Sequence, residues 1–469
     1  MMDKFEYKGR WWLPDKPEKQ VSGTLRFTPN EGAILELIGS FKDTKDILKP
    51  EIILGISSNG KKITLHKCFE TKCFETKTKS NVSFPGLLTS SFYANEIFVG
   101  AHFQKSEDIK FRELSIRYSY LDEWVNISGF NIQYPDEKEI VIKYKEPEPI
   151  QASIGEDCKI FIEIQVTRPT HSIVQKEASI KQRTYIRIEH SVEKSLEEYW
   201  NIMRHIQNFL SLGVTEPVCP LTVKGITESI KDMPYNLPVE VEIYRHSLEV
   251  SKTPKTLYPQ DMLFTFKDIS DRFEIFLKNW FEKADTLGPV YDLYFGTLYN
   301  PRMYLQHQFL SLIQAIEAYH RRKFEGKYLS NNDYEPIYEK FKKFINELAI
   351  ESSFKEALKS KLKYGNEYSL RKRLKDLLEK YKEVVDDFIE DKDIFINRVV
   401  DTRNYLTHYD KNLREKAVDG EQLYYVTQQL KIVIVICLLS ELGFNFKEIK
   451  NLLAKNRRYR YVFNRKHFR

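Results

Sequence analysis

Three residues near the C-terminal end of the sequence have side chains suited to phosphodiester chemistry. Arg403 and Asn404 are adjacent, and His408 follows Asn404 by four positions. An imidazole with its usual pKa of about 6.5 can accept or donate a proton near neutral pH. A guanidinium keeps its charge and can hold a phosphate through two hydrogen bonds, while an amide can orient either partner. Because RNA supplies its own nucleophile, the 2′-hydroxyl, this trio could cleave RNA without a metal ion.

The segment that carries these residues, from Asp391 to His408, has the periodicity of a helix. A mostly apolar stripe recurs at steps of three and four residues: Phe395, Val399, Thr402 and Leu406. A polar stripe follows the same steps two positions later: Asn397, Asp401, Asn404 and His408. Since two positions correspond to about 200° of helix rotation, the polar stripe lies roughly opposite the packed one. We therefore expect the trio to converge near the end of a rigid helix, with Asp401 as a supporting carboxylate.

The spacing alone does not decide between a functional and a structural histidine. Arg302 and His307 have the same separation as Arg403 and His408. Arg183 and His190 match if six intervening residues are allowed, but they lie on an expected strand, whose alternation scatters side chains. On spacing alone, residues 403–408 could equally be an exposed helix end.

The neighbourhood of the motif resembles a known family. Arg403-Asn404-x3-His408 resembles the Arg-polar-x3-His motif of HEPN ribonucleases (the higher eukaryotes and prokaryotes nucleotide-binding superfamily). The segment from Gln308 to Arg321 is similar to the opening helix of the ApeA-type branch, whose members are anti-phage defence proteins with their own N-terminal β-rich domain. The resemblance covers roughly residues 290–445. In the N-terminal half it rests on the layout and on the run from Gly9 to Pro14.

This resemblance implies a metal-independent endoribonuclease of abortive infection that uses no cofactor, with Arg403, Asn404 and His408 as catalytic residues. It implies that two protomers bring their motifs together in a homodimer or higher homo-oligomer. It also favours tRNA as the RNA and a phage-derived trigger at the N-terminal domain. Glu317 would orient Arg403 or His408 from the upstream helix, or else be an ordinary surface carboxylate. The alternative function is a non-catalytic HEPN protein that binds RNA or serves as an adaptor.

Composition sets broad limits on the protein class. The 469 residues are 42% hydrophobic and 13% aromatic, which favours sizeable folded cores, and the net charge of +6 permits an acidic partner. Five scattered cysteines indicate reduced thiols in a cytosol. The longest apolar run, Ile432 to Leu439, is far shorter than the roughly 20 residues that span a bilayer. We expect a cytoplasmic protein without a membrane segment.

The sequence predicts an α+β multidomain protein. Residues 1–190 form a β-rich sandwich or barrel-like domain, because short alternating strands recur and Asn59-Gly60 is a strong hairpin signal. Residues 191–289 form a mixed continuation and bridge, with a helix from Ser191 to Gly213, capped by Ser191 or Ser195, and another through Asp285. Residues 290–469 form the all-α HEPN bundle, whose first helix is expected to begin at Pro301. The charged run Lys359 to Lys382 is typical of a solvated face.

The C-terminal tail interleaves cations with aromatic residues and contains no acid from Lys455 to Arg469. Cations bind phosphates by counterion release, and aromatic rings offer stacking platforms for unpaired bases. Either the tail clamps RNA beside the site, or it is a solvated tail that packs its aromatic rings on the bundle. The candidate RNA-binding residues are Arg457, Arg458, Tyr459, Arg460, Arg465 and Lys466.

No pattern for a metal or nucleotide site stands out. The tandem repeat Lys67 to Thr71 and Lys72 to Thr76 contains Cys68 and Cys73, but no second pair of metal ligands at zinc-finger spacing. A small duplication in a loop or edge strand explains it better. A phosphate-binding Gly-rich Lys-Ser/Thr loop is not found either, which argues against use of ATP.

Overall fold

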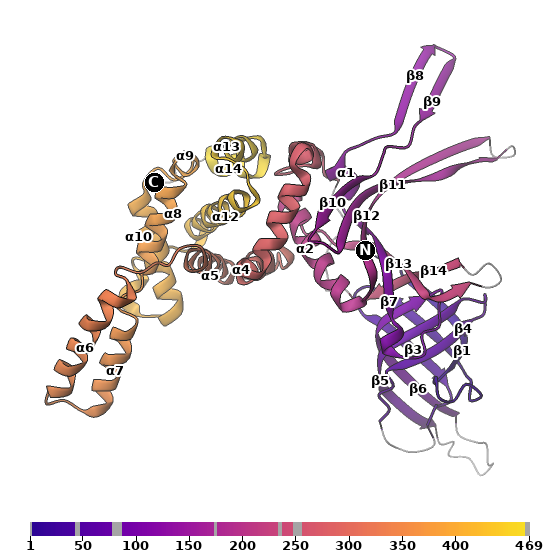
Figure 1. Ribbon diagram of the computed structural model, residues 1–469, viewed down its shortest axis with the longest axis horizontal. Coiled ribbons are helices and arrows are strands. Elements are labelled where there is room, and N and C mark those ends of the chain that lie inside the picture. The colour runs from indigo at the N-terminus through magenta and orange to yellow at the C-terminus, as the bar shows by residue number, and fades with distance from the viewer. Residues whose placement is uncertain are drawn as a thin grey trace. The chain divides into compact units, whose positions relative to one another are not determined.

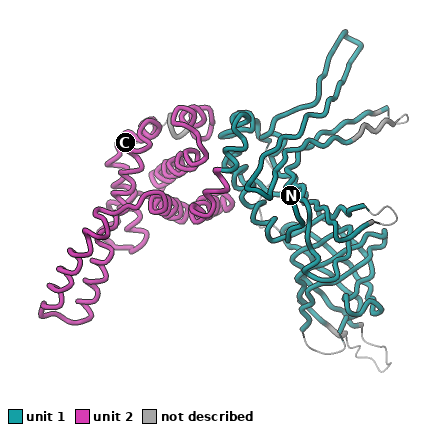
Figure 2. The backbone as a smooth tube through the Cα atoms, viewed as in Figure 1, with its two compact units in different colours: residues 1–278 teal, residues 279–469 magenta. Residues whose placement is uncertain are grey.

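The computed structural model describes residues 2–42, 47–76, 87–172, 176–232, 237–246 and 256–464. The chain divides into two compact units, residues 1–278 and 279–469 (Figure 2). Strands β1 to β14 belong to the first unit and helices α5 to α14 to the second (Figure 1). The predicted fold class, a β-rich N-terminal part followed by a helical C-terminal part, is confirmed.

The first strands close into an antiparallel barrel. Their order is β6-β3-β2-β1-β4-β5, and β5 pairs back with β6. Alternate side chains of each strand fill the interior, where Leu25, Leu35, Leu65 and Phe92 are buried. The predicted hairpin at Asn59-Gly60 joins two of these strands. The strands are β1 (Phe5–Trp12), β2 (Val21–Thr28), β3 (Gly32–Ile38), β4 (Ile52–Ser57), β5 (Lys62–Thr76) and β6 (Leu87–Val99).

Trp11 fixes the packing between β1 and β4. Its ring is fully buried over Gly55, its register partner, where a Cβ atom would lie only 2.2 Å from the ring. Its indole N–H donates to the backbone carbonyl of Gly23 on β2, at 3.2 Å. The Gly9 to Pro14 run therefore forms part of the barrel through β1. Gly55 lets the Trp11 indole approach the backbone of β4, because glycine has no side chain.

From β6 the sheet continues beyond the barrel through β14, β13, β7, β12, β11 and β10. Helix α2 covers this part, since Tyr118 of β7 donates to the carbonyl of Met203 and Tyr199 donates to that of Phe111. The remaining elements of the unit are β7 (Lys110–Tyr118), α1 (Leu121–Val125), β8 (Phe130–Asp136), β9 (Glu139–Tyr144), β10 (Ile150–Ile154), β11 (Cys158–Ser172), β12 (Glu177–Ser195), α2 (Leu196–Val214), β13 (Pro220–Asp232), β14 (Leu237–Arg245) and α3 (Phe266–Ile269). Strands β8 and β9 form a separate ribbon.

Of the two predicted caps of the helix that follows β12, Ser191 is wrong and Ser195 is confirmed. Residues 191–195 complete β12, and α2 begins only at Leu196. Ser195 is the helix cap. Its side chain accepts a hydrogen bond from the backbone N–H of Glu198, and the Glu198 carboxylate accepts one from the backbone N–H of Ser195. This reciprocal pair satisfies two backbone donors and sets the boundary between strand and helix.

The second unit is a helical bundle built around α12. Residues Ile434 to Cys437 of this helix are fully buried. Helix α12 is long and apolar enough to cross a membrane, but 67% of its most apolar window is buried inside the bundle, as expected of a core helix. Helix α4 starts in the first unit. The helices are α4 (Phe273–Tyr299), α5 (Leu305–Lys323), α6 (Asn331–Glu347), α7 (Ser352–Lys363), α8 (Leu370–Lys380), α9 (Lys382–Val385), α10 (Lys392–His408), α11 (Lys411–Arg414), α12 (Gly420–Leu442), α13 (Phe446–Lys455) and α14 (Arg457–Asn464).

Two predicted helix ends differ from the structure. Helix α4 does not stop at Asp285 but runs through Pro289 to Tyr299. The rings of Trp280 and Tyr291, which precede and follow Pro289 in the sequence, are buried and stack with their centroids 4.3 Å apart. This packing offsets the cost of a proline inside a helix, which is about 3 kcal/mol. Pro301 does not begin a helix, because it lies in a turn in which Met303 donates to the carbonyl of Asn300. Helix α5 starts at Leu305.

Candidate functional site

Helix α10 presents the Arg403 to His408 motif in its last two turns. Asp391 caps its start, because the carboxylate accepts from the N–H of Ile394 at 2.8 Å. Tyr409 ends it in a left-handed conformation, with φ of 52°. Phe395, Val399 and Thr402 are buried as the periodicity predicts, whereas Leu406 is only partly covered. The motif therefore sits at the exposed C-terminal end of a helix that is anchored along its other face.

Arg403 is held by two neighbours. Its Nη1 donates to the side-chain oxygen of Asn404 at 3.0 Å, and its Nη2 lies 4.0 Å from Oε2 of Glu317 on α5. The Arg403 side chain is 35% exposed and that of Glu317 23% exposed. The structure thus brings Arg403, Asn404 and Glu317 together from two helices. The guanidinium stays accessible to an anionic ligand.

His408 is the last residue of α10 and is exposed to solvent. It lies one turn after Asn404, on the same face of the helix. Asp401 occupies this face one turn earlier and is half-buried. In the part of the chain that the structure describes, neither the His408 ring nor the Asp401 carboxylate forms a hydrogen bond or ion pair. The imidazole is therefore accessible to a substrate, and no described residue orients it.

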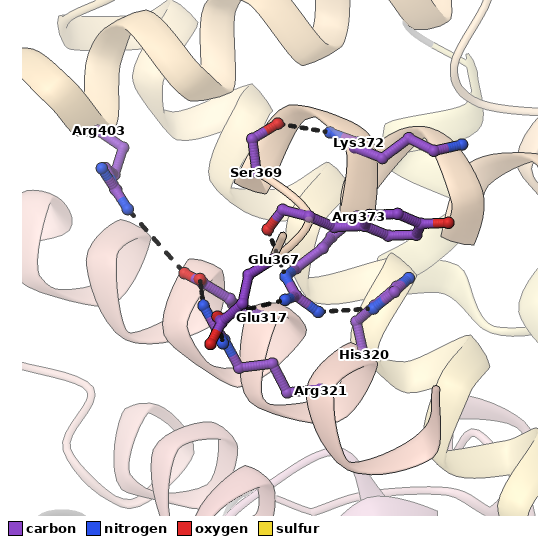
Figure 3. Close-up of polar contacts among 9 residues, drawn as sticks. Glu317, His320, Arg321, Glu367, Ser369, Lys372, Arg373 and Arg403 are labelled. Carbon is purple, nitrogen blue, oxygen red and sulfur yellow. Dashed lines mark hydrogen bonds and ion pairs between the residues drawn. The ribbon is translucent and has the colours of Figure 1, made fainter. Parts of the chain in front are cut away.

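Glu317 also belongs to a charged cluster between α5 and α8 (Figure 3). Its Oε1 lies 3.1 Å from Nη2 of Arg321, which in turn contacts Glu367. Behind them, Arg373 is buried and donates to Nδ1 of His320 at 3.0 Å. Sequence reasoning missed Glu367 and Arg373 because both lie in a charged run interpreted as solvated. The available signal was that Arg373 stands between Leu370 and Leu374, on the apolar face of its helix.

Two family models match the chain. One, ApeA N-terminal domain 1, matches residues 6–280, which is more than half of the sequence. The other, Apea-like HEPN, matches residues 310–448. The chain belongs to the ApeA-type HEPN family of anti-phage defence proteins. Comparison with curated proteins and with solved structures gave no significant match.

The HEPN match includes the Arg403 to His408 motif. HEPN domains are generally nucleases, and the matched residues include Glu317 on α5 together with Arg403, Asn404 and His408 on α10. The HEPN match therefore contains both helices of the candidate site, α5 with Glu317 and α10 with Arg403 and His408.

The basic tail lies beyond the HEPN match. Arg457, Arg458 and Arg460 are exposed on α14, whereas Tyr459 is 3% exposed. Because its ring is buried, Tyr459 is not available to stack on a base in this structure. The other two candidates, Arg465 and Lys466, lie outside the described residues. Helix α14 therefore presents exposed cations at 457, 458 and 460, without the expected aromatic platform at 459.

The described residues of this ApeA-type HEPN chain include no group of three or more His, Cys, Asp or Glu side chains placed to hold a metal ion. Cys68 and Cys73 of the tandem repeat both lie on β5, the first buried and the second exposed. The pairing of β5 with β4 ends at His66, before the repeat, and Cys68 to Thr76 pair with β6 alone among the named strands. The repeat therefore lies along the edge of the β4–β5 pairing, as the expectation of an edge strand requires. The duplication lengthens a barrel strand.

Proposed function

We propose that this ApeA-type HEPN protein is a metal-independent endoribonuclease. The observation that carries the proposal is the pairing of a steadied, accessible Arg403 with an exposed His408 at one end of α10, inside the HEPN match. The reaction is attack of the ribose 2′-hydroxyl on the adjacent phosphorus. The 5′-oxygen leaves, and the products are a 2′,3′-cyclic phosphate and a 5′-hydroxyl.

Each residue has a distinct role in this reaction. His408 takes the proton of the 2′-hydroxyl as general base. Arg403 stabilises the charge that develops on the pentacoordinate phosphate, and Asn404 holds its guanidinium through the 3.0 Å hydrogen bond. His408 of a second protomer protonates the leaving 5′-oxygen, so the complete site needs a homodimer or higher homo-oligomer. Glu317 supports Arg403 from α5.

The proposed biological setting is supported by the family assignment. The protein acts in the cytoplasm, where cleavage of cellular RNA, with tRNA the favoured class, stops phage growth by abortive infection. The N-terminal β-rich unit serves as the sensor that restrains the nuclease until a phage-derived trigger engages it. Its match to the ApeA N-terminal model supports this assignment.

A second candidate function is a non-catalytic RNA-binding HEPN protein. The observation in its favour is that His408 has no orienting partner within the described residues, whereas a general base is usually held by one. In that case Arg403 and the cations of α14 would hold RNA without cutting it.

One experiment separates these functions. Purified wild-type and His408→Ala proteins are incubated with total bacterial RNA in EDTA, and the fragment ends are sequenced. The nuclease predicts cyclic phosphate ends with the wild type and a loss of at least about 10²-fold in rate with the variant. Equal cleavage by both proteins would refute the role of His408. If neither cleaves, the assay is repeated with phage-infected lysate, and continued inactivity there favours the binding protein.

A further inference from the structure

A line of alternating charges connects Arg403 to the interior of the bundle (Figure 3). From Arg403 it passes through Glu317, Arg321 and Glu367 to Arg373. The side chains of Arg321 and Glu367 are 44% and 31% exposed, whereas that of Arg373 is 1% exposed. The line therefore begins at the candidate site and ends at a buried cation.

Arg373 cannot easily move. Its Nε donates to the carbonyl of Tyr368 and its Nη1 to Nδ1 of His320, both at 3.0 Å. A Cβ atom on Gly326 would lie 2.4 Å from Nη1, so only glycine leaves room for the guanidinium. Its Nη2 faces Oε2 of Glu367 at 3.9 Å. Because these contacts fix the Arg373 guanidinium, they also fix the position of the Glu367 carboxylate beside it.

The two oxygens of Glu317 are shared between two guanidinium groups. Oε1 is 3.1 Å from Arg321 and Oε2 is 4.0 Å from Arg403, so Arg321 is the closer partner. Arg321 can share Glu317 because its own Nη1 is engaged by Glu367. If Glu367 lost its charge, Arg321 would be left with Glu317 as its acidic partner and would draw the carboxylate away from Arg403.

We propose that Glu367 and Arg373 are positioning residues for Arg403, which they hold in place through Arg321 and Glu317. This inference rests on the proposed ribonuclease function. Neither residue touches the RNA. Their effect is to keep one oxygen of Glu317 directed at the Arg403 guanidinium, so that the phosphate meets it in a fixed orientation.

The test uses Glu367→Gln, a partly exposed and nearly isosteric change. Single-turnover cleavage of total bacterial RNA is followed by counting cyclic phosphate ends over a range of protein concentrations, with infected lysate added if the wild type requires it. We expect the maximal rate to fall by about tenfold to a hundredfold, because small misplacements of a catalytic group are costly. The protein concentration at half-maximal rate should stay nearly unchanged.

A second variant distinguishes positioning from general damage. If Arg321 becomes the competitor for Glu317, removing it as well should restore activity, so Arg321→Ala/Glu367→Gln should cleave faster than Glu367→Gln alone. A structural defect would make the double variant worse or equal. Glu441→Gln is the control, since Glu441 is a carboxylate of the same unit, with its side chain 8% exposed, that contacts Lys323 and Tyr319 outside this line.

Crystal structures of the wild type and Glu367→Gln provide a readout that does not depend on cleavage. The expected change is a longer distance between Arg403 and Glu317, with both Glu317 oxygens on Arg321. An unchanged contact, or a double variant no faster than the single one, overturns the inference even if the protein is a ribonuclease. If the wild type does not cleave even with infected lysate, the proposed function fails, and the crystal structures still decide whether Glu367 positions Arg403.

Discussion

The buried hydroxyl of Thr402 accepts a hydrogen bond of 3.0 Å from the backbone N–H of Val418. Thr402 directly precedes Arg403 and is 0% exposed, and Val418 lies in the segment that leads into α12. This bond ties the helix that carries the motif to the central helix of the bundle. It also satisfies a backbone donor that has no access to water.

The first prediction concerns this bond. Thr402→Val keeps the shape of the side chain but leaves the Val418 N–H without an acceptor, so the free energy of unfolding should fall by about 1–3 kcal/mol. Urea denaturation of the second unit's transition measures the loss. Thr407→Val is the control on the same helix, because its exposed hydroxyl donates to the Arg403 carbonyl, and its removal should cost less than about 0.5 kcal/mol. Equal effects of the two changes would contradict the role of Thr402.

The second prediction tests the planar shape of the Arg403 side chain. Arg403→Lys keeps the positive charge but cannot engage a phosphate, Asn404 and Glu317 at once through a fixed fork of donors. The single-turnover rate should drop by about 10²–10³-fold, as for the loss of a donor to a developing oxyanion. Binding of a non-cleavable RNA, measured by fluorescence anisotropy, should change much less. A lysine variant that cleaves at the wild-type rate would show that charge alone suffices.

The third prediction is a dependence of stability on pH. Burial, together with the Arg373 and Arg321 charges, lowers the pKa of His320 below its usual 6.5, although Asp376 opposes the shift. The unfolded chain therefore binds a proton at a higher pH than the folded chain. Stability should fall as the pH drops from about 6.5 toward the lower folded pKa, and level off below it.

His320→Gln provides the comparison for this effect, since an amide oxygen can still accept from Arg373 and does not titrate. Urea unfolding of both proteins at a series of pH values between 7.5 and 5, all chosen around the usual histidine pKa, gives the difference. The wild type should lose stability relative to the variant across that interval. A constant difference would mean that His320 does not carry the dependence.

The fourth prediction concerns the cations of α14. If Arg460 contacts an RNA phosphate, Arg460→Ala should weaken binding of a single-stranded oligonucleotide and reduce the slope of log affinity against log salt by about 0.7. Lys361→Ala on α7 removes an equally exposed charge and should leave the slope unchanged. If both variants behave like the wild type, the tail is a solvated helix and not an RNA clamp.

The fifth prediction tests the barrel. Gly55→Ala places a methyl group where the buried Trp11 ring lies, so the indole or the strand must shift, at a cost of about 1–3 kcal/mol. Tryptophan fluorescence during chemical unfolding should report an earlier transition. Gly288→Ala, on α4 with open space around the new methyl group, should instead be neutral or stabilising. A normal transition for Gly55→Ala would show that the barrel tolerates movement of Trp11.

Strands, turns and helices could be predicted from the sequence where a pattern of residue types has a single physical explanation. The recurring short alternations and the Asn59-Gly60 turn gave correct strands, and the periodicity after Asp391 gave the helix of the motif. Features that depend on partners distant in sequence could not be predicted. The return pairing of β5 with β6, the passage of α4 through Pro289 and the burial of Arg373 are set by tertiary packing.

Strand β6 belongs to two structures at once, because it closes the barrel against β5 and also carries the open sheet through β14. The barrel is therefore not a detachable module. Cutting the chain after β6 would expose the backbone of Glu96 to Val99 as a free edge, which invites aggregation. Exchange of N-terminal parts between relatives of this protein, in the laboratory or during evolution, should therefore succeed when the whole N-terminal unit is transferred.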